Sequence, residues 1–322
     1  MPYSSTLQKP ITQTRAVVEL ILAAMMWGLG FVAAVWALRD AGPLAITGWR
    51  FVIAGVAGLL FAHRFIRTKE ARLYLRYAWL PGACIAATII FQTWGLQYTT
   101  ATKSGFLTCL YALIVPLFEA ARGRTTERPA TLITCSAIAL LGVALMCGLA
   151  SPSQSLDDRT RLNLGDFLTL ICAFAASAHI VVTAGLQKRL GERFNGFHFN
   201  SAQSLAAGFP TLLLALMIEP HTINMPVRMA VNAMNASVLP FLGFLSLSFC
   251  STMIGFALQI RAQRVLSPST ASLLFLLESP FAALFAFIFL NEEMGPYQLL
   301  GGAMILGSVA YSTMKAIRGL RG

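Results

Sequence analysis

The feature that most constrains this chain is a series of long apolar runs, each nearly free of charge, separated by short polar segments. We delimit ten runs, at 17–38, 44–62, 77–97, 101–121, 130–149, 165–187, 197–218, 236–260, 269–290 and 296–315. An α-helix rises about 1.5 Å per residue, so about 20 apolar residues cross the hydrocarbon layer of a bilayer. The runs therefore predict ten membrane-spanning helices.

The composition excludes an ordinary soluble domain. Only 11% of the 322 residues are charged and 57% are hydrophobic, whereas soluble domains carry about 25% charged residues because their surfaces face water. Inside lipid every backbone N–H and C=O must be bonded within its own segment, which favours helices. A membrane barrel would show alternating strands of about ten residues rather than continuous runs. We therefore expect an all-α membrane protein.

The formal net charge of +11 would suggest a nucleic-acid partner for a soluble protein. In a membrane protein, Lys and Arg instead hold loops on the cytoplasmic side. With the N-terminus inside, 18 of the 24 Lys and Arg residues fall in inner segments and four in outer loops. We therefore expect both termini in the cytoplasm, an even number of spans, a bacterial inner membrane and no nucleic-acid partner. The first run is too long for the core of a signal peptide.

Features recur in the same order in the two halves of the chain. Pro116 in the fourth run corresponds to Pro280 in the ninth, and Glu127 and Glu292 each lie fifteen residues before a Gly. Five spans per copy is odd, so the second copy enters the membrane from the opposite side, as in the inverted repeats of secondary transporters. The expected organisation is a cytoplasmic segment 1–16, a first repeat 17–149, a linker 150–164, a second repeat 165–316 and a cytoplasmic tail 317–322.

Two segments carry a resemblance to a known family. The stretch from Gly95 to Tyr111, followed by Val115-Pro116, and the stretch from Leu277 to Leu284 resemble EamA-type proteins of the drug/metabolite transporter superfamily. Ser279 departs from the pattern, since it stands where the family is expected to place Pro directly after Glu. The resemblance implies a ten-helix fold and export of small metabolites, such as amino acids or amphiphilic compounds.

Ionisable groups at bilayer depth cost several kcal/mol, so they are candidates for function. Glu278 lies near the middle of the ninth run and could couple protons or bind an amine; alternatively it could bond a neighbouring helix end. Lys103 opens the fourth run and could meet a substrate carboxylate, pair with Glu278, or extend to the headgroups. Arg50 could bind a carboxylate or form an ion pair that fixes helix packing. His179 could titrate near neutral pH or be a bonded core histidine.

Four further residues complete the candidate site. Trp27 and Tyr111 lie in mid-run and are expected in an aromatic cavity wall. Tyr98 lies near a run end, where Tyr is often an interface anchor, but it too could line the cavity. Gln92 could line the cavity or bond between helices. We expect no catalytic residues, metal site or cofactor.

The sequence as a whole predicts a secondary transporter that works by alternating access on a small-molecule substrate, with protons as candidate coupling ions, as a monomer or homodimer. An intramembrane enzyme is the first alternative, with Ser177 and His179 as the nearest pair of nucleophile and base in sequence. A channel or scaffold is the second, although no filter sequence is present. The stretch Gly28–Ala33 matches a dinucleotide-binding pattern, but it lies inside an apolar run with no preceding strand, so nucleotide binding is not expected.

Overall fold

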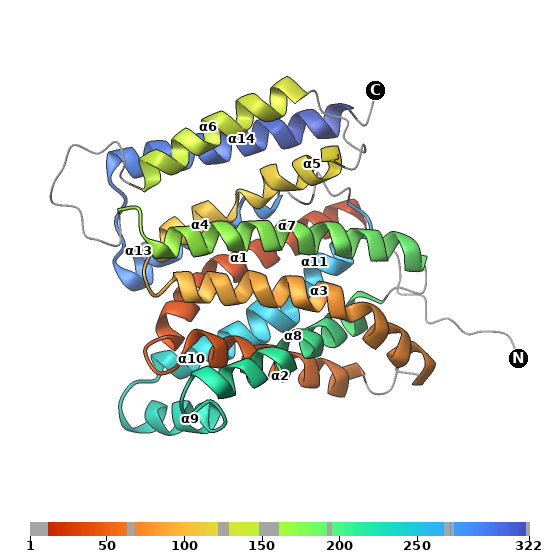
Figure 1. The fold of residues 1–322 in the computed structure, drawn as a ribbon, viewed down its shortest axis with the longest axis vertical. Coiled ribbons are helices and arrows are strands. Elements are labelled where there is room, and N and C mark those ends of the chain that lie inside the picture. Colours follow the sequence, from red (N-terminus) through yellow and green to blue (C-terminus); the bar gives the residue numbers. More distant parts are fainter. Residues whose placement is uncertain are drawn as a thin grey trace, which may run out of the picture.

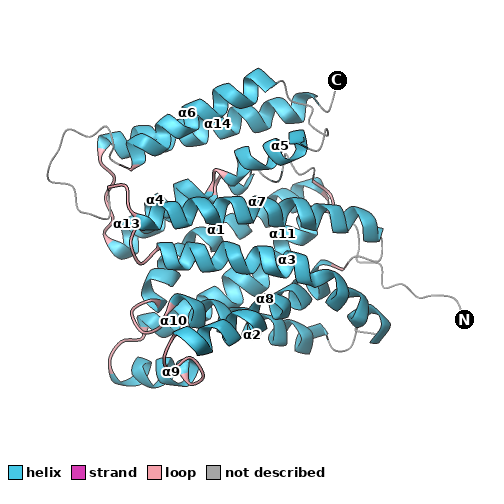
Figure 2. Cartoon of the chain, in the orientation of Figure 1, coloured by secondary structure: helices cyan, strands magenta, loops and turns pink. Residues whose placement is uncertain are grey.

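The structure is a computed structural model that describes residues 12–62, 68–121, 129–147, 161–191, 195–266, 271 and 274–319. Within these ranges the backbone forms helices, turns and loops, and no strand (Figures 1 and 2). The all-α class expected from the apolar runs is therefore confirmed. Residues 1–11 of the expected cytoplasmic segment, 150–160 of the linker and 320–322 of the tail lie outside the described residues.

The helices follow one another as α1 (Gln13–Ala37), α2 (Pro43–Ala62), α3 (Thr68–Gly95), α4 (Ala101–Thr108), α5 (Tyr111–Ala121), α6 (Pro129–Met146), α7 (Leu164–Leu190), α8 (Gly196–Ile218), α9 (Met225–Asn235), α10 (Leu239–Leu245), η2 (Ser246–Gly255), α11 (Phe256–Ala262), α13 (Glu278–Leu290) and α14 (Pro296–Gly319). Among the described residues, five segments are long and apolar enough to cross a membrane: α1, α2, α7, α8 and the continuous segment Leu239–Ala262. Three shorter apolar segments are Ala101–Val115, Ile133–Met146 and Glu278–Leu290.

Two of the expected spans are not single helices. The fourth run breaks at Cys109 and Leu110 into α4 and α5, and α13 begins only at Glu278, after a turn in the ninth run. Glu278 is therefore in the first turn of a helix rather than at mid-helix. The two breaks lie close together in space: the Ser279 hydroxyl at the start of α13 donates to the carbonyl of Gly105 in α4 at 2.9 Å. That bond engages a carbonyl just before the α4 break and ties it to the start of α13.

A further helix, α9, occurs where the sequence indicated a loop before the eighth span. It buries Met225 and Met229 and exposes Val227. Arg228 donates to the carbonyl of Asp40 at 2.7 Å, so α9 covers the turn between α1 and α2. The eighth span correspondingly begins at Leu239, three residues later than expected.

The helices pack in pairs that mix the two halves of the chain. α6 and α14 lie along each other at one edge of the bundle, and α2 and α8 do so at the other edge (Figure 1). Between them, α3 packs against α7, while α1 packs against α13 and against the segment formed by α10, η2 and α11. Each central helix thus contacts helices that are distant in the sequence.

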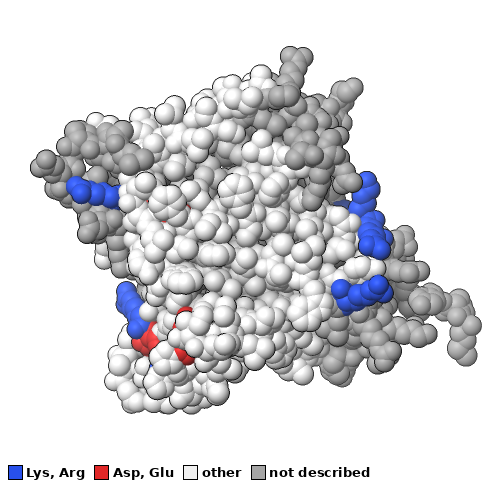
Figure 3. Space-filling view, viewed as in Figure 1, with Lys and Arg blue, Asp and Glu red and all other residues white. Residues whose placement is uncertain are grey.

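On the face of the molecule seen in Figure 3, the charged side chains lie at two opposite edges. Figure 3 shows Lys and Arg at the two ends of the bundle, with a wide uncharged belt between them. Large apolar side chains of the helices face outward, for example Leu60, Leu140 and Leu213, each at least 65% exposed. An outward-facing apolar belt bounded by charge is the surface that a bilayer requires.

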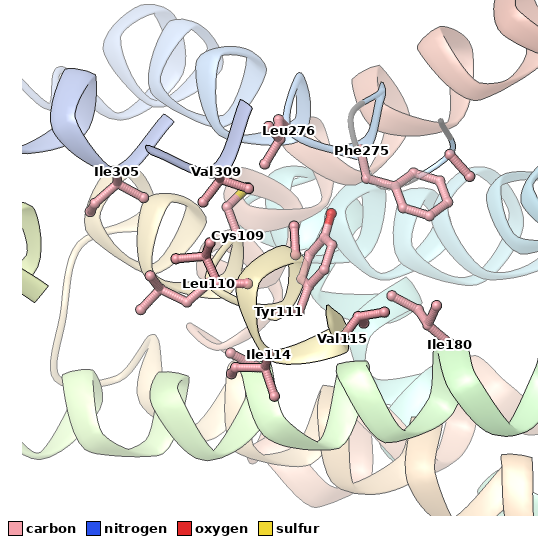
Figure 4. Packing of buried hydrophobic residues seen from close by; sticks show 14 of the residues in the cluster. Cys109, Leu110, Tyr111, Ile114, Val115, Ile180, Phe275, Leu276, Ile305 and Val309 are labelled. Carbon is pink, nitrogen blue, oxygen red and sulfur yellow. The ribbon is translucent and has the colours of Figure 1, made fainter. Parts of the chain in front are cut away.

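The largest cluster of buried apolar side chains draws mainly on α4, α5, α6, α7 and α14. Cys109, Leu110 and Tyr111 at the α4–α5 break pack with Phe275 and with Ile305 of α14 (Figure 4). All five side chains are at most 7% exposed. The break in the fourth span is thus filled by side chains rather than open to lipid.

Two carboxylates join the halves of the chain at helix starts. Glu219, after α8, accepts from the backbone N–H groups of Leu44 and Ala45 in α2, both at 2.8 Å. Glu292, after α13, accepts from those of Ala101 and Thr102 in α4, both at 2.9 Å. The first N–H groups of a helix have no partner within the helix and favour negative charge, so each carboxylate caps a helix of the other half.

A glycine permits a close contact between α1 and α13. A Cβ added at Gly28 in α1 would lie 2.6 Å from the Cβ of Phe281 and 2.9 Å from the backbone N of Ala282 in α13. The glycine spacing that resembled a dinucleotide motif is therefore used for packing in a membrane helix.

We expect Gly28→Ala to lower the melting temperature of the purified protein, because α1 and α13 must move apart to accept the methyl group. Overpacking of this kind costs about 1–3 kcal/mol. Gly185→Ala is the matched control, because a Cβ at Gly185 would meet no atom within 4 Å. Equal melting temperatures for the two variants in the same detergent would show that this contact is not tight.

Candidate functional site

A cavity lies in the middle of the bundle, between helices of both halves. Its volume is about 70 Å³, enough for a few water molecules. The wall is formed by Trp27, Gly30, Ala34, Arg50, Ile85, Thr88, Ile89, Gln92, Thr108, Tyr111, Ala176, His179, Ile180, Leu247, Ser251, Phe256, Gln259, Phe275 and Glu278. Six of the eight predicted site residues line this cavity, and Lys103 and Tyr98 do not.

Glu278 places a carboxyl group in the wall from the first turn of α13. It is 7% exposed and, among the described residues, has neither a hydrogen bond nor an ion pair. The bond to a neighbouring helix end that was one alternative for Glu278 is therefore absent from the described part of the chain. Burying a carboxylate without a partner is costly, so this group is available to a ligand or a proton.

Arg50 enters the cavity wall from α2 and is 2% exposed. Its Nε donates to the Thr252 hydroxyl at 2.8 Å and its Nη2 to the Ser251 hydroxyl at 3.0 Å. Its guanidinium carbon also lies 5.7 Å from the ring centre of Phe51. No carboxylate of the described residues pairs with it, so the packing ion pair that we considered for Arg50 is replaced by neutral hydroxyls.

His179 belongs to a chain of polar side chains behind the wall. Its Nε2 lies 3.1 Å from Oε1 of Gln203, and the Gln203 amide donates to Oδ1 of Asn200 at 3.0 Å. Because the Gln203 amide nitrogen donates to Asn200, its oxygen faces His179 and accepts, which assigns the proton of this contact to Nε2 of His179. His179 is therefore both a bonded histidine and a cavity residue, which combines the two alternatives predicted for it.

Aromatic rings form much of the apolar wall. The ring centre of Trp27 lies 5.3 Å from that of Phe256 and 5.4 Å from that of Phe275, and Tyr111 lies 6.4 Å from Phe275. The Tyr111 hydroxyl and Oε1 of Gln259 are buried without a hydrogen-bond partner among the described residues. Buried polar atoms are nearly always bonded, so these two atoms offer contacts to a ligand or to water.

Lys103 is not in this cavity and does not pair with Glu278. Its Nζ lies 2.8 Å from Oδ2 of Asp166, with both side chains 1% exposed, and donates to the carbonyl of Arg161 at 2.6 Å. Asp166 is placed there by a capping box with Asn163 at the start of α7. The acid that caps α7 thus neutralises the lysine at the start of α4, and the expected substrate contact or headgroup contact of Lys103 is replaced by a buried ion pair.

Of the remaining predicted residues, Gln92 lies in the cavity wall, and Tyr98 and Ser177 do not. Gln92 lines the cavity and donates to the Thr108 hydroxyl at 3.4 Å, so it both lines the wall and bonds between helices. Tyr98 lies outside the cavity and is 41% exposed in the turn after α3. Ser177 donates to backbone carbonyls rather than to His179, so the nucleophile and base of the enzyme alternative do not meet.

Several wall residues were not singled out in the sequence. Ser251, Phe256 and Phe275 are of types that are common in membrane helices, so composition alone does not mark them. Gln259 is different, because an amide inside an apolar run is the same signal that identified Gln92. The sequence therefore marks Gln259 by the same cue as Gln92.

Comparisons with known proteins agree with this architecture. The model of the EamA-like transporter family matches residues 14–148 and 163–314. An uncharacterized transporter of Archaeoglobus fulgidus is 24% identical over 298 residues, covering 92% of this chain and 85% of that protein. One of Methanothermobacter thermautotrophicus is 25% identical over 308 residues, covering 91% and 84%. A crystal structure with 18% identity has a TM-score of 0.63 and covers 95% of this chain and 99% of its own, which shows a shared fold.

Proposed function

Because this chain belongs to the EamA-like transporter family, we propose that it is a secondary transporter that exports small metabolites across a bacterial inner membrane. That the chain is a membrane transporter follows from the family and from its apolar helices. The substrate class, the direction and the mechanism are our proposal.

One observation carries the substrate class. Arg50 and Glu278 line the same apolar cavity from α2 and α13, and each is buried without a charged partner among the described residues. A ligand that carries both a cationic and an anionic group could compensate both side chains at once. The rings of Trp27, Tyr111 and Phe275 would contact its apolar part. We therefore propose a small zwitterionic or amphiphilic metabolite as the substrate.

The packing supports an arrangement of ten crossings in two inverted repeats. If α4 with α5 forms one crossing and α10, η2 and α11 form another, the described helices other than α9 account for ten crossings. Under this arrangement the contact of α3 with α7 in one pair of spans corresponds to the contact of the α10–η2–α11 segment with α1 in the other, and both contacts are present. The breaks in the fourth and ninth spans also correspond. Broken helices near the middle of the membrane are typical of transporter sites.

We propose that the two halves move alternately around the cavity, opening it to one side of the membrane at a time. The distribution of Lys and Arg along the sequence supports cytoplasmic N- and C-termini. With this orientation, the end of the bundle where α1 begins is the cytoplasmic end. The proposed movement does not require a second copy of the chain, because one chain supplies the whole cavity wall.

The proposal is tested with everted membrane vesicles from cells that produce the chain and from cells that carry the empty vector. We expect faster uptake of at least one compound from a pool of labelled amino acids and small metabolites into the first vesicles. A dependence of that uptake on an imposed proton gradient would support proton coupling. If a folded, membrane-inserted chain takes up no zwitterionic or amphiphilic compound of the pool, the proposed substrate class is wrong.

A further inference from the structure

Part of the eighth span is a π-helix, and this segment touches both the cavity and Arg50. The π-helix η2 covers Ser246–Gly255. In a π-helix each N–H bonds to the carbonyl five residues earlier, and such segments are rare and often lie at functional sites. The Thr252 hydroxyl also donates to the carbonyl of Leu247, five residues earlier, at 2.8 Å. Ser251 in the same segment lines the cavity.

Side chains from two other helices hold this segment in place. Nε1 of Trp27 in α1 donates to the carbonyl of Ser251 at 3.2 Å. Nδ2 of Asn200 in α8 donates to the carbonyls of Thr252 and Met253 at 3.1 Å and 3.2 Å. These bonds satisfy carbonyls of the segment from outside, so its geometry is determined by its neighbours as well as by its own backbone.

The hydroxyls of η2 orient the guanidinium group of Arg50. Thr252 accepts from Nε and Ser251 from Nη2, which uses one edge of the planar group. Arg carries five N–H donors, and the other three have no acceptor among the described residues. Both acceptors are neutral, so the positive charge stays uncompensated in a buried site. An arginine with a fixed, unpaired edge is suited to bind a carboxylate with two parallel bonds.

We propose that Ser251 and Thr252 are positioning residues that present the unpaired edge of Arg50 to an acidic group of the transported molecule, so that the site selects substrates with a carboxylate or similar anion. The inference rests on the proposed function and adds to it which side chain recognises the acid and what orients that side chain. Glu278, from α13, would meet the cationic group of the same substrate.

The test compares three probes that differ only in charged groups: leucine, 4-methylpentanoate, which lacks the amino group, and 3-methylbutylamine, which lacks the carboxylate. Affinities are measured by ligand-dependent thermal stabilisation of the purified full chain. We expect wild type to bind both leucine and 4-methylpentanoate. Thr252→Val and Ser251→Ala should weaken binding of 4-methylpentanoate about tenfold or more and leave binding of 3-methylbutylamine unchanged.

Two further variants separate positioning from folding. Ser248→Ala is the control within η2, because among the described residues the Ser248 hydroxyl bonds only to the carbonyl of Phe244, and Ser248 does not line the cavity. Its ratio of acid to amine affinities should equal that of wild type. Thr252→Ser keeps the acceptor for Nε and should restore the ratio that Thr252→Val loses.

Three outcomes would contradict, in turn, the role of Thr252, the role of Arg50 and the proposed zwitterionic substrate. If Thr252→Val weakens binding of 4-methylpentanoate and 3-methylbutylamine equally, or weakens neither, Thr252 is a structural residue and the inference is wrong. A wild type that binds only the amine would exclude Arg50 as the acid site and leave the role of Glu278 intact. A folded wild type that binds none of the three probes would overturn the zwitterion proposal and this inference with it.

Discussion

Glu278→Gln should lower the initial rate of substrate uptake about 10- to 150-fold, since it removes a charge and keeps the shape of the side chain. The range corresponds to the loss of one hydrogen bond to a charged group, about 1.5–3 kcal/mol. The effect is expected to be large because Glu278 is buried in the cavity wall and has no other partner among the described residues. The measurement is uptake into everted vesicles with equal amounts of each variant.

Glu293→Gln is the matched control for this prediction. Glu293 is an exposed glutamate outside the cavity, in the loop after α13. The same chemical change there should leave uptake at the wild-type rate. If Glu278→Gln also transports at that rate, with and without a proton gradient, Glu278 is a packing residue. It then neither couples protons nor binds a charged group of the substrate.

Lys103→Met should destabilise the protein by about 3–5 kcal/mol, because it leaves the carboxylate of Asp166 buried without its cation. For a chain of this size we expect a melting temperature lower by roughly 5–15 °C. The expectation rests on the 2.8 Å ion pair, in which both side chains are 1% exposed. Differential scanning fluorimetry in one detergent measures the change.

The double variant Lys103→Met with Asp166→Asn identifies the cause. It removes both charges and keeps an acceptor oxygen for the Thr99 hydroxyl, which donates to Asp166 at 2.9 Å. Because a neutral pair has no uncompensated charge, more than half of the lost stability should return. Lys188→Met, at an exposed position near the end of α7, should change the melting temperature little. If Lys103→Met is instead as stable as wild type and binds the substrate more weakly, Lys103 is a substrate-binding residue.

The two predictions assign opposite roles to residues that the sequence alone marks as equivalent. Glu278 and Lys103 are both ionisable groups in or beside apolar runs, and the cost of charge in lipid makes both candidates for function. What differs is the helix that faces each one. Asp166 meets Lys103 because α4 and α7 are neighbours, whereas no described cation approaches Glu278 within an ion-pair distance.

The π-helix and the break in the fourth span were beyond prediction for a related reason. An apolar run of suitable length predicts a continuous helix, and nothing in Ser246–Gly255 or near Cys109 carries a Pro or charge that would interrupt it. The deviations depend on bonds from other helices: Asn200 to carbonyls of η2, and Ser279 to the carbonyl of Gly105. A local pattern cannot contain a hydrogen bond to a residue more than fifty positions away.

The sequence by itself determined the all-helical membrane class and the family, and six of the eight residues that it predicted for the site line the cavity. It could do so because the transfer of charge and backbone polarity into lipid is costly for each residue separately, so the signal is local and can be read along the chain. Only the tertiary structure decided that Lys103 is neutralised by Asp166, that Arg50 is held by two hydroxyls, and that Glu278 has no such partner among the described residues. Whether a buried charge is satisfied or available depends on helices that folding brings together from distant parts of the chain.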